Sequence, residues 1–125
     1  MMDKKVLAFG FDTLLEIMAV TGAVKHVGAE VVNVPKADYN KSLSALAGKN
    51  ISLAKPYLGG PLGGKMLVFC GMNEDIEKVL PELKKAGIGV NCLKAALTPY
   101  NWNWSAIDLY GELWKEHNTM WGKQK

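Results

Sequence analysis

The sequence has few cysteines, little excess of one charge and no long apolar run. Cys70 and Cys92 are the only cysteines and lack the C-x-x-C spacing of metal or redox pairs, so we expect buried thiols. The 15 basic and 12 acidic residues leave a net charge of +3, which is too balanced to predict binding to nucleic acid. No apolar stretch reaches the roughly 18 residues of a membrane-spanning helix. The sequence therefore predicts neither a nucleic-acid nor a membrane partner.

The start of the chain also lacks the pattern of a signal peptide. Asp12 and Glu16 interrupt the apolar run that follows Lys4 and Lys5, before it reaches the length of a signal sequence. We therefore expect a cytoplasmic protein. At 125 residues, with 49% hydrophobic and 22% charged residues, the sequence predicts one folded domain.

Four short apolar segments alternate with segments of helical pattern. Each apolar segment has the length of a buried strand, and most are followed closely by glycine or proline. These expected strands are residues 6–11, 30–34, 66–71 and 90–97. Helical spacing and capping residues predict helices that begin near Asp12, Asp38, Asn73 and Ser105, with the last ending near residue 117.

This alternation favours a single three-layer α/β domain. We expect a four-stranded, mainly parallel sheet in the order 2-1-3-4, with helices on both faces and right-handed crossovers. The carboxyl ends of the strands then share one edge, where the loops 10–13, 70–73 and 98–104 meet. The alternative is a ferredoxin-like α+β plait, in which neighbours among the first three strands are antiparallel.

Two segments fall outside the expected elements. Residues 49–65 include the run Gly-Gly-Pro-Leu-Gly-Gly at 59–64, which suits neither helix nor strand and predicts a flexible surface loop. Residues 118–125 lose helical periodicity, so we expect this tail to fray.

Three segments resemble a family of small bacterial proteins. Their sequences are VLAFGFD at 6–12, MLVFCGM at 66–72 and LKAALTPYNWNWS at 93–105. In this order they are similar to the domain of unknown function 3783 over roughly the whole chain, and the third segment is the most specific. The resemblance implies no established activity, cofactor or catalytic residue. Lys65 stands where an acid is common in the family.

The candidate ligand-binding residues follow the ends of three expected strands. Hydroxyl, amide and indole groups suit an uncharged or anionic small ligand, and glycine lets a phosphate approach a helix N-terminus. The candidates are Gly10, Asp12, Gly71, Asn73, Thr98, Asn101, Asn103 and Trp104. Each also has a structural alternative, because asparagines form turns, Asp12 and Asn73 can cap helices, and tryptophan can fill the core.

The sequence favours a non-enzymatic module that binds a ligand or regulates, since no charged acid–base set is expected at the sheet edge. We expect a small-molecule ligand but no catalytic residue, metal or cofactor, and a homo-oligomer is left open. One alternative is a small enzyme or phospho-carrier that uses Cys70 or Asp12. Another is a protein-interaction module that uses exposed tryptophans, among them Trp102 and Trp121.

Overall fold

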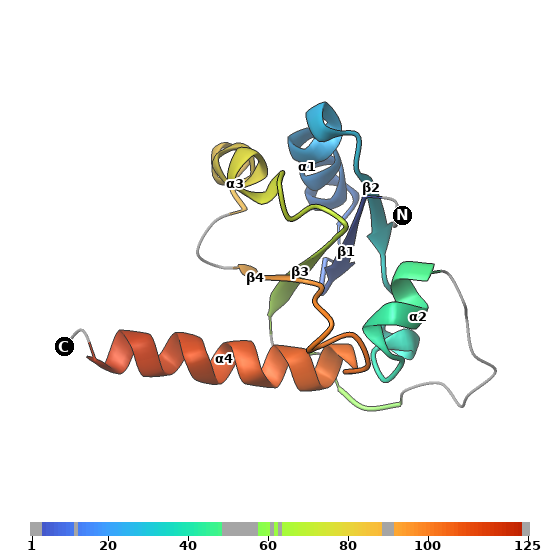
Figure 1. Ribbon diagram of the computed structural model, residues 1–125, viewed down its shortest axis with the longest axis vertical. Helices are drawn as coiled ribbons and strands as arrows, with labels where there is room; N and C mark the ends of the chain where they lie inside the picture. Colours follow the sequence, from blue (N-terminus) through green and yellow to red (C-terminus); the bar gives the residue numbers. More distant parts are fainter. Residues whose placement is uncertain are drawn as a thin grey trace.

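A computed structural model describes residues 4–11, 13–48, 58–60, 62, 64–88 and 92–123, with the side chains of α4 described to residue 116. In chain order its elements are β1 (Lys5–Phe9), α1 (Leu14–Val24), the 3₁₀ turn η1 (Lys25–Val27), β2 (Glu30–Asn33), the 3₁₀ turn η2 (Lys36–Asp38), α2 (Leu43–Gly48), β3 (Lys65–Cys70), α3 (Ile76–Lys85), β4 (Cys92–Ala96) and α4 (Ala106–Lys123) (Figure 1). Asp12 and most of the predicted loop at 49–65 lie outside the described residues. Helix α4 continues to Lys123, so the helix end predicted near residue 117 is wrong.

The four strands form one sheet in the order β2-β1-β3-β4, which confirms the predicted order and the α/β class. β1 is parallel to β2, and β3 is parallel to β4, but β1 and β3 are antiparallel. The sheet is therefore mainly parallel, as predicted, but the expectation that the first and third strands run parallel to one another is wrong. Each β-α-β crossover imposes a parallel direction only on the two strands that it joins. The long connection from β2 to β3 carries α2 and imposes no such direction.

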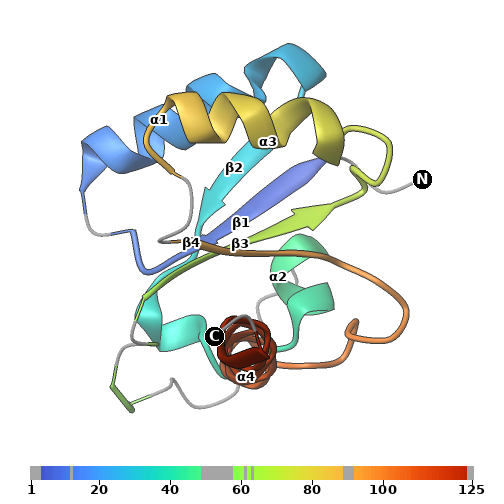
Figure 2. The ribbon, with the colours of Figure 1, turned by 90° about the vertical axis from the view of Figure 1, so that its left-hand side faces the viewer.

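The sheet lies between two helical layers (Figure 2), with α1 and α3 on one face and α2 and α4 on the other. Alternate residues of β1 point to opposite layers: Val6 and Ala8 pack under α1 and α3, and Leu7 and Phe9 under α2 and α4. Because both faces are covered, each central strand is apolar after its first residue, a lysine. Full burial of a large apolar side chain contributes about 1.5–3 kcal/mol, so these two strands supply much of the core.

The chain consists of two similar halves, residues 5–48 and 65–123. Each half has a strand, a helix, a parallel strand and a second helix on the opposite face of the sheet. The sequence VLAFGFD at 6–12 matches LVFCGMN at 67–73 in its pattern of apolar residues, glycine and a final Asp or Asn. The shared glycines, Gly10 and Gly71, both adopt a left-handed backbone, with φ of 80° and 67°.

A local two-fold axis relates these halves. Leu7 lies opposite its counterpart Val68 in the antiparallel strand pair. Ser42 and Ser105, which each precede the second helix of their half, form an antiparallel bridge with one another. Both contacts join equivalent residues, as contacts at the axis of a symmetric dimer do. The halves are therefore packed like two copies of one unit.

At Gly10 the backbone of the first half passes very close to Gly64, the residue just before β3. A Cβ atom added to Gly10 would lie 2.5 Å from the carbonyl oxygen of Gly64, and the φ of +80° disfavours any other residue. Gly22 in α1 offers a contrast, since a Cβ atom there would meet nothing within 4 Å.

We predict that Gly10→Ala lowers the free energy of unfolding by about 2–4 kcal/mol, through backbone strain and overpacking. Gly22→Ala should raise it by about 1 kcal/mol, because alanine is the better helix former. Urea denaturation of both variants measures the two effects. If Gly10→Ala unfolds with the same free energy as the wild type, the backbones at Gly10 and Gly64 do not lie as close as described.

Candidate functional site

The antiparallel centre of the sheet separates the predicted site residues between two opposite edges. Phe9 pairs with Met66, so the turn at Gly10 lies where β3 begins. The turn at Gly71 lies at the other edge, with the loop after β4, because β3 and β4 are parallel. The expectation that the loops after the first, third and fourth strands meet at one edge is therefore wrong. Asp12 lies outside the described residues.

Asn101 closes the loop that follows β4. Its Oδ1 accepts a hydrogen bond from the Thr98 N–H at 2.9 Å, and its Nδ2 donates to the Ala96 carbonyl at 3.0 Å. The Thr98 hydroxyl in turn accepts from the Asn101 N–H at 3.2 Å. Asn101 is only 8% exposed, so its amide serves the turn itself. These bonds support the structural alternative for both residues.

Trp104 connects the same loop to the first half of the chain. Its carbonyl accepts from the Leu43 N–H at 2.8 Å, where α2 begins. Its half-buried indole packs against the core under α2 and α4, and its ring lies 5.5 Å from that of Tyr100. Asn103 is exposed at the surface of this loop. Ser105 caps α4 as predicted, because its hydroxyl accepts from the Asp108 N–H at 3.1 Å.

The helix caps predicted at Asp12 and Asn73 are replaced by other residues. Thr13 is the N-cap of α1, and its side chain accepts from the Glu16 N–H. Helix α3 begins at Ile76, and Asp75 at its N-cap makes no capping hydrogen bond. The exposed Asn73 lies too far before Ile76 to cap this helix, so that prediction is wrong.

A cleft of about 640 Å³ opens at the edge where β1 and β2 end. We call it the β1–β2 cleft. Both halves contribute to it, and its lining residues are Gly10, Phe11, Asn33, Val34, Pro35, Lys36, Tyr39, Leu62, Gly64 and Lys65. Of the predicted site residues that the structure describes, Gly10 alone belongs to this lining. The sequence does carry a signal for it, since Pro35 marks the carboxyl end of β2 and a lysine and a tyrosine follow.

Tyr39 forms the inner wall of the β1–β2 cleft. Its ring is 5% exposed and meets the ring of Phe9 edge-on, with 5.7 Å between ring centroids. Its hydroxyl accepts a hydrogen bond from the Gly10 N–H at 3.0 Å. The tyrosine therefore holds the left-handed turn of Gly10 in place from the loop after β2.

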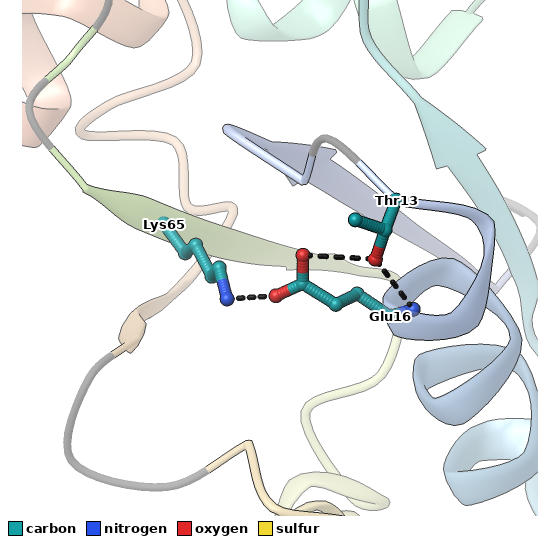
Figure 3. Close-up of polar contacts among 3 residues, drawn as sticks. All are labelled: Thr13, Glu16 and Lys65. Atoms are coloured by element: carbon teal, nitrogen blue, oxygen red, sulfur yellow. Dashed lines mark hydrogen bonds and ion pairs between the residues drawn. The ribbon is translucent and has the colours of Figure 1, made fainter.

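Lys65 and Glu16 form an ion pair beside the cleft (Figure 3). The second carboxylate oxygen of Glu16 accepts from the Thr13 hydroxyl at 3.1 Å. The ammonium group of Lys65 lies 5.6 Å from the centre of the Phe11 ring, within reach of a cation–π interaction. The pair joins the start of β3 in one half to the first turn of α1 in the other.

A smaller cleft of about 270 Å³ lies beside the same ion pair. Glu16 and Lys65 both line it, together with Leu15, Ala19, Ala86, Gly87, Ile88 and Cys92. Of the pair, Lys65 lines both clefts, whereas Glu16 lines the smaller one.

Both cysteines are buried thiols, as the sequence predicts. Burial raises the pKa of Cys70 to about 12, although Lys5 opposes the shift. Burial also raises the pKa of Cys92 to about 11, against the charges of Lys94 and Lys65. At neutral pH both thiols are protonated, which counts against the alternative in which Cys70 acts as a nucleophile.

The described residues contain neither a metal-binding cluster nor a membrane-spanning helix. Within that part of the chain, no group of three or more His, Cys, Asp or Glu side chains is placed to hold a metal ion. None of the described helices combines the length and the apolar character that crossing a bilayer requires.

In the comparison with known proteins, the second half of the chain matches a protein family. Residues 65–120 match the family described as "Domain of unknown function (DUF3783)", which confirms the resemblance for that part. The match begins with β3 and ends within α4. No curated protein and no solved structure matches the chain.

We predict that Asn101→Ala lowers the free energy of unfolding by about 1–3 kcal/mol, because it leaves the Thr98 N–H and the Ala96 carbonyl without their partner. Asn103→Ala, in the same loop but exposed, should change it by less than about 0.5 kcal/mol. Thermal and urea unfolding test both variants. Equal stabilities would mean that the Asn101 bonds do not hold the loop.

We also predict that the free energy of unfolding falls above pH 9, and that it falls less in Cys70→Ala. In the folded chain the pKa of the Cys70 thiol is about 12, whereas the ordinary pKa of a cysteine thiol, expected in the unfolded chain, is 9.0. The contribution of the thiol is therefore complete below pH 9 and is lost as the pH rises toward 12. Between about pH 8 and pH 10 the wild type should lose about 1 kcal/mol more than Cys70→Ala. Identical losses in urea titrations would contradict the prediction.

Proposed function

We propose that this chain, which carries a domain of the DUF3783 family in its second half, is a non-enzymatic module that binds a small molecule in the β1–β2 cleft. The observation that carries the proposal is the cleft of about 640 Å³ where two parallel strands end beside the start of β3. Small-molecule sites typically measure about 300–1,000 Å³. In sheets with parallel strands, ligands bind at the carboxyl ends.

The lining of the cleft supports a ligand with an apolar body and a polar or charged group. Phe11 and Tyr39 supply aromatic surface, and both are held by the core. Asn33, Lys36 and Lys65 supply an amide and two ammonium groups around them. A mainly apolar wall with a few polar groups is the usual composition of a small-molecule site.

The chemistry of the described residues supports binding without catalysis. Enzymes that use a nucleophile place it within hydrogen-bond distance of a base. The described lining of the β1–β2 cleft holds no cysteine, histidine, serine or carboxylate for that task. The alternative in which Asp12 takes part in catalysis stays a hypothesis.

A second candidate function, protein interaction, is favoured by apolar side chains at the surface. Leu14, Leu15 and Met18 lie on one turn of α1 and are 73%, 79% and 58% exposed. Trp102 in the loop after β4 is 40% exposed. The side chain of Trp121 lies outside the described part of α4. Clusters of exposed apolar residues mark interaction surfaces in many soluble proteins.

The proposed ligand site is tested by closing the cleft. We predict that Asn33→Trp, which places an indole over the cleft from the exposed end of β2, abolishes ligand binding and preserves the fold. Glu30→Trp is the matched control, because Glu30 is also exposed on β2 but lies outside the lining. A library of neutral and charged metabolites is screened by amide chemical shifts of the labelled chain. Ligands should shift the signals of Gly10 and Lys65 in the wild type and in Glu30→Trp only.

Two results would contradict the proposed function. One is that no compound in the library shifts the amides that surround the cleft. The other is that compounds bind Asn33→Trp as tightly as they bind the wild type.

A further inference from the structure

The described lining of the β1–β2 cleft contains two cations and no acidic side chain. Lys36 stands at the start of η2 and Lys65 at the start of β3, and both line the cleft. The chain contains no arginine, so an anion in the cleft would meet ammonium groups and not the planar fork of arginine. The charge of the lining suits a ligand that carries an oxyanion group.

Lys65 already has an internal counter-ion in Glu16 (Figure 3). The two side chains retain 37% and 28% of their exposure, so solvent reaches the pair. Ion pairs as exposed as this one contribute little to stability. An anion from solution can therefore replace the Glu16 carboxylate at Lys65 without unfolding the protein.

Glu16 is also held by contacts that do not involve Lys65. Its carboxylate accepts from the Thr13 hydroxyl, and its N–H donates to the same hydroxyl oxygen at 3.2 Å. This arrangement at the start of α1 resembles a capping box, in which glutamine serves as well as glutamate. Glu16 therefore stays in place when Lys65 turns toward a ligand.

Phe11 helps to fix the position of the Lys65 side chain. Its ring lines the β1–β2 cleft and lies 5.6 Å from the Lys65 ammonium group. A cation over an aromatic face is attracted by the ring, whichever anion neutralises it. The ammonium group is therefore kept at the border of the cleft, within reach of both Glu16 and a ligand.

We propose that the β1–β2 cleft binds the oxyanion group of its ligand, a phosphate or a carboxylate, through Lys65, and that this group displaces Glu16 from the lysine. The inference rests on the proposed ligand site and specifies the class of ligand. Glu16 is then an internal competitor, whose negative charge lowers the affinity of the cleft for anions.

The test is a titration of the labelled full-length chain with inorganic phosphate at constant ionic strength, followed at the amides of Gly10, Phe11, Gly64 and Lys65. Glu16→Gln should bind phosphate about three- to fivefold more tightly than the wild type, because glutamine keeps the cap and removes the competing charge. Lys65→Met should bind at least about tenfold more weakly. A gain of affinity in Glu16→Gln cannot result from misfolding.

The chain supplies a matched control at its other edge. Lys4 in the first half is the counterpart of Lys65 in the second half. Its ammonium group lies 2.9 Å from the Asp75 carboxylate, near the start of α3. Lys4→Met and Asp75→Asn remove the same charges there and should leave phosphate affinity unchanged. Acetate in place of phosphate shows which oxyanion is preferred, and glycerol should cause no shift.

Three results would overturn the inference. They are an unchanged or weaker affinity in Glu16→Gln, equal phosphate shifts around Lys4 and around Lys65, and no phosphate shift at the cleft in either the wild type or Glu16→Gln. The ligand site itself survives these results if a neutral compound binds the cleft and loses its binding in Asn33→Trp. The ligand site fails when nothing binds the cleft, or when compounds bind Asn33→Trp as tightly as they bind the wild type.

Discussion

The antiparallel pairing of β1 with β3 determines where the other elements of this protein lie. Leu7 of β1 faces Val68 of β3 at the centre of the sheet. On its outer side β1 pairs with the parallel strand β2, and β3 pairs with the parallel strand β4. The carboxyl ends of the two parallel pairs therefore point to opposite edges. The bridge between Ser42 and Ser105 repeats the same two-fold relation in the layer of α2 and α4. One strand pairing thus creates both the two-fold arrangement of the halves and the two separate edges.

Two ion pairs cross between the halves in equivalent places, and the loops around them have diverged. Lys4 reaches Asp75 and Lys65 reaches Glu16, so each strand-start lysine contacts the helix start of the other half. After β2 the chain turns at Pro35 and brings the Tyr39 hydroxyl to Gly10 beside an open cleft. After β4, Asn101 instead bonds to its own loop. The two halves therefore share one arrangement of strands and helices but differ in the loops that follow β2 and β4.

Strand positions and strand order follow from the sequence because local patterns encode them. Apolar runs that end near glycine or proline place all four strands to within two residues, and the Ser105 hydroxyl caps α4 as its spacing with Asp108 predicts. The caps of α1 and α3 were less predictable, since Asp, Asn and Thr all favour this position and the first helical turn decides among them. Of the described candidate residues, only Gly10 lies at the cleft. The candidates after the third and fourth strands were expected at the same edge, but the direction of β3 places them at the opposite edge.

The sequence by itself determined the elements, their alternation and the burial of both cysteines, since each depends on hydrophobic pattern and local turn chemistry. The sequence also contains an internal repeat, because residues 67–73 follow the same order of apolar residues, glycine and a final Asp or Asn as residues 6–12. Only the tertiary structure decided the direction of β3, and with it the meeting of Gly10, Tyr39 and Lys65 around one cleft. The physical reason is that a long connection leaves strand direction free, so packing between the two halves selects it. Residues far apart in the chain become neighbours only after that selection.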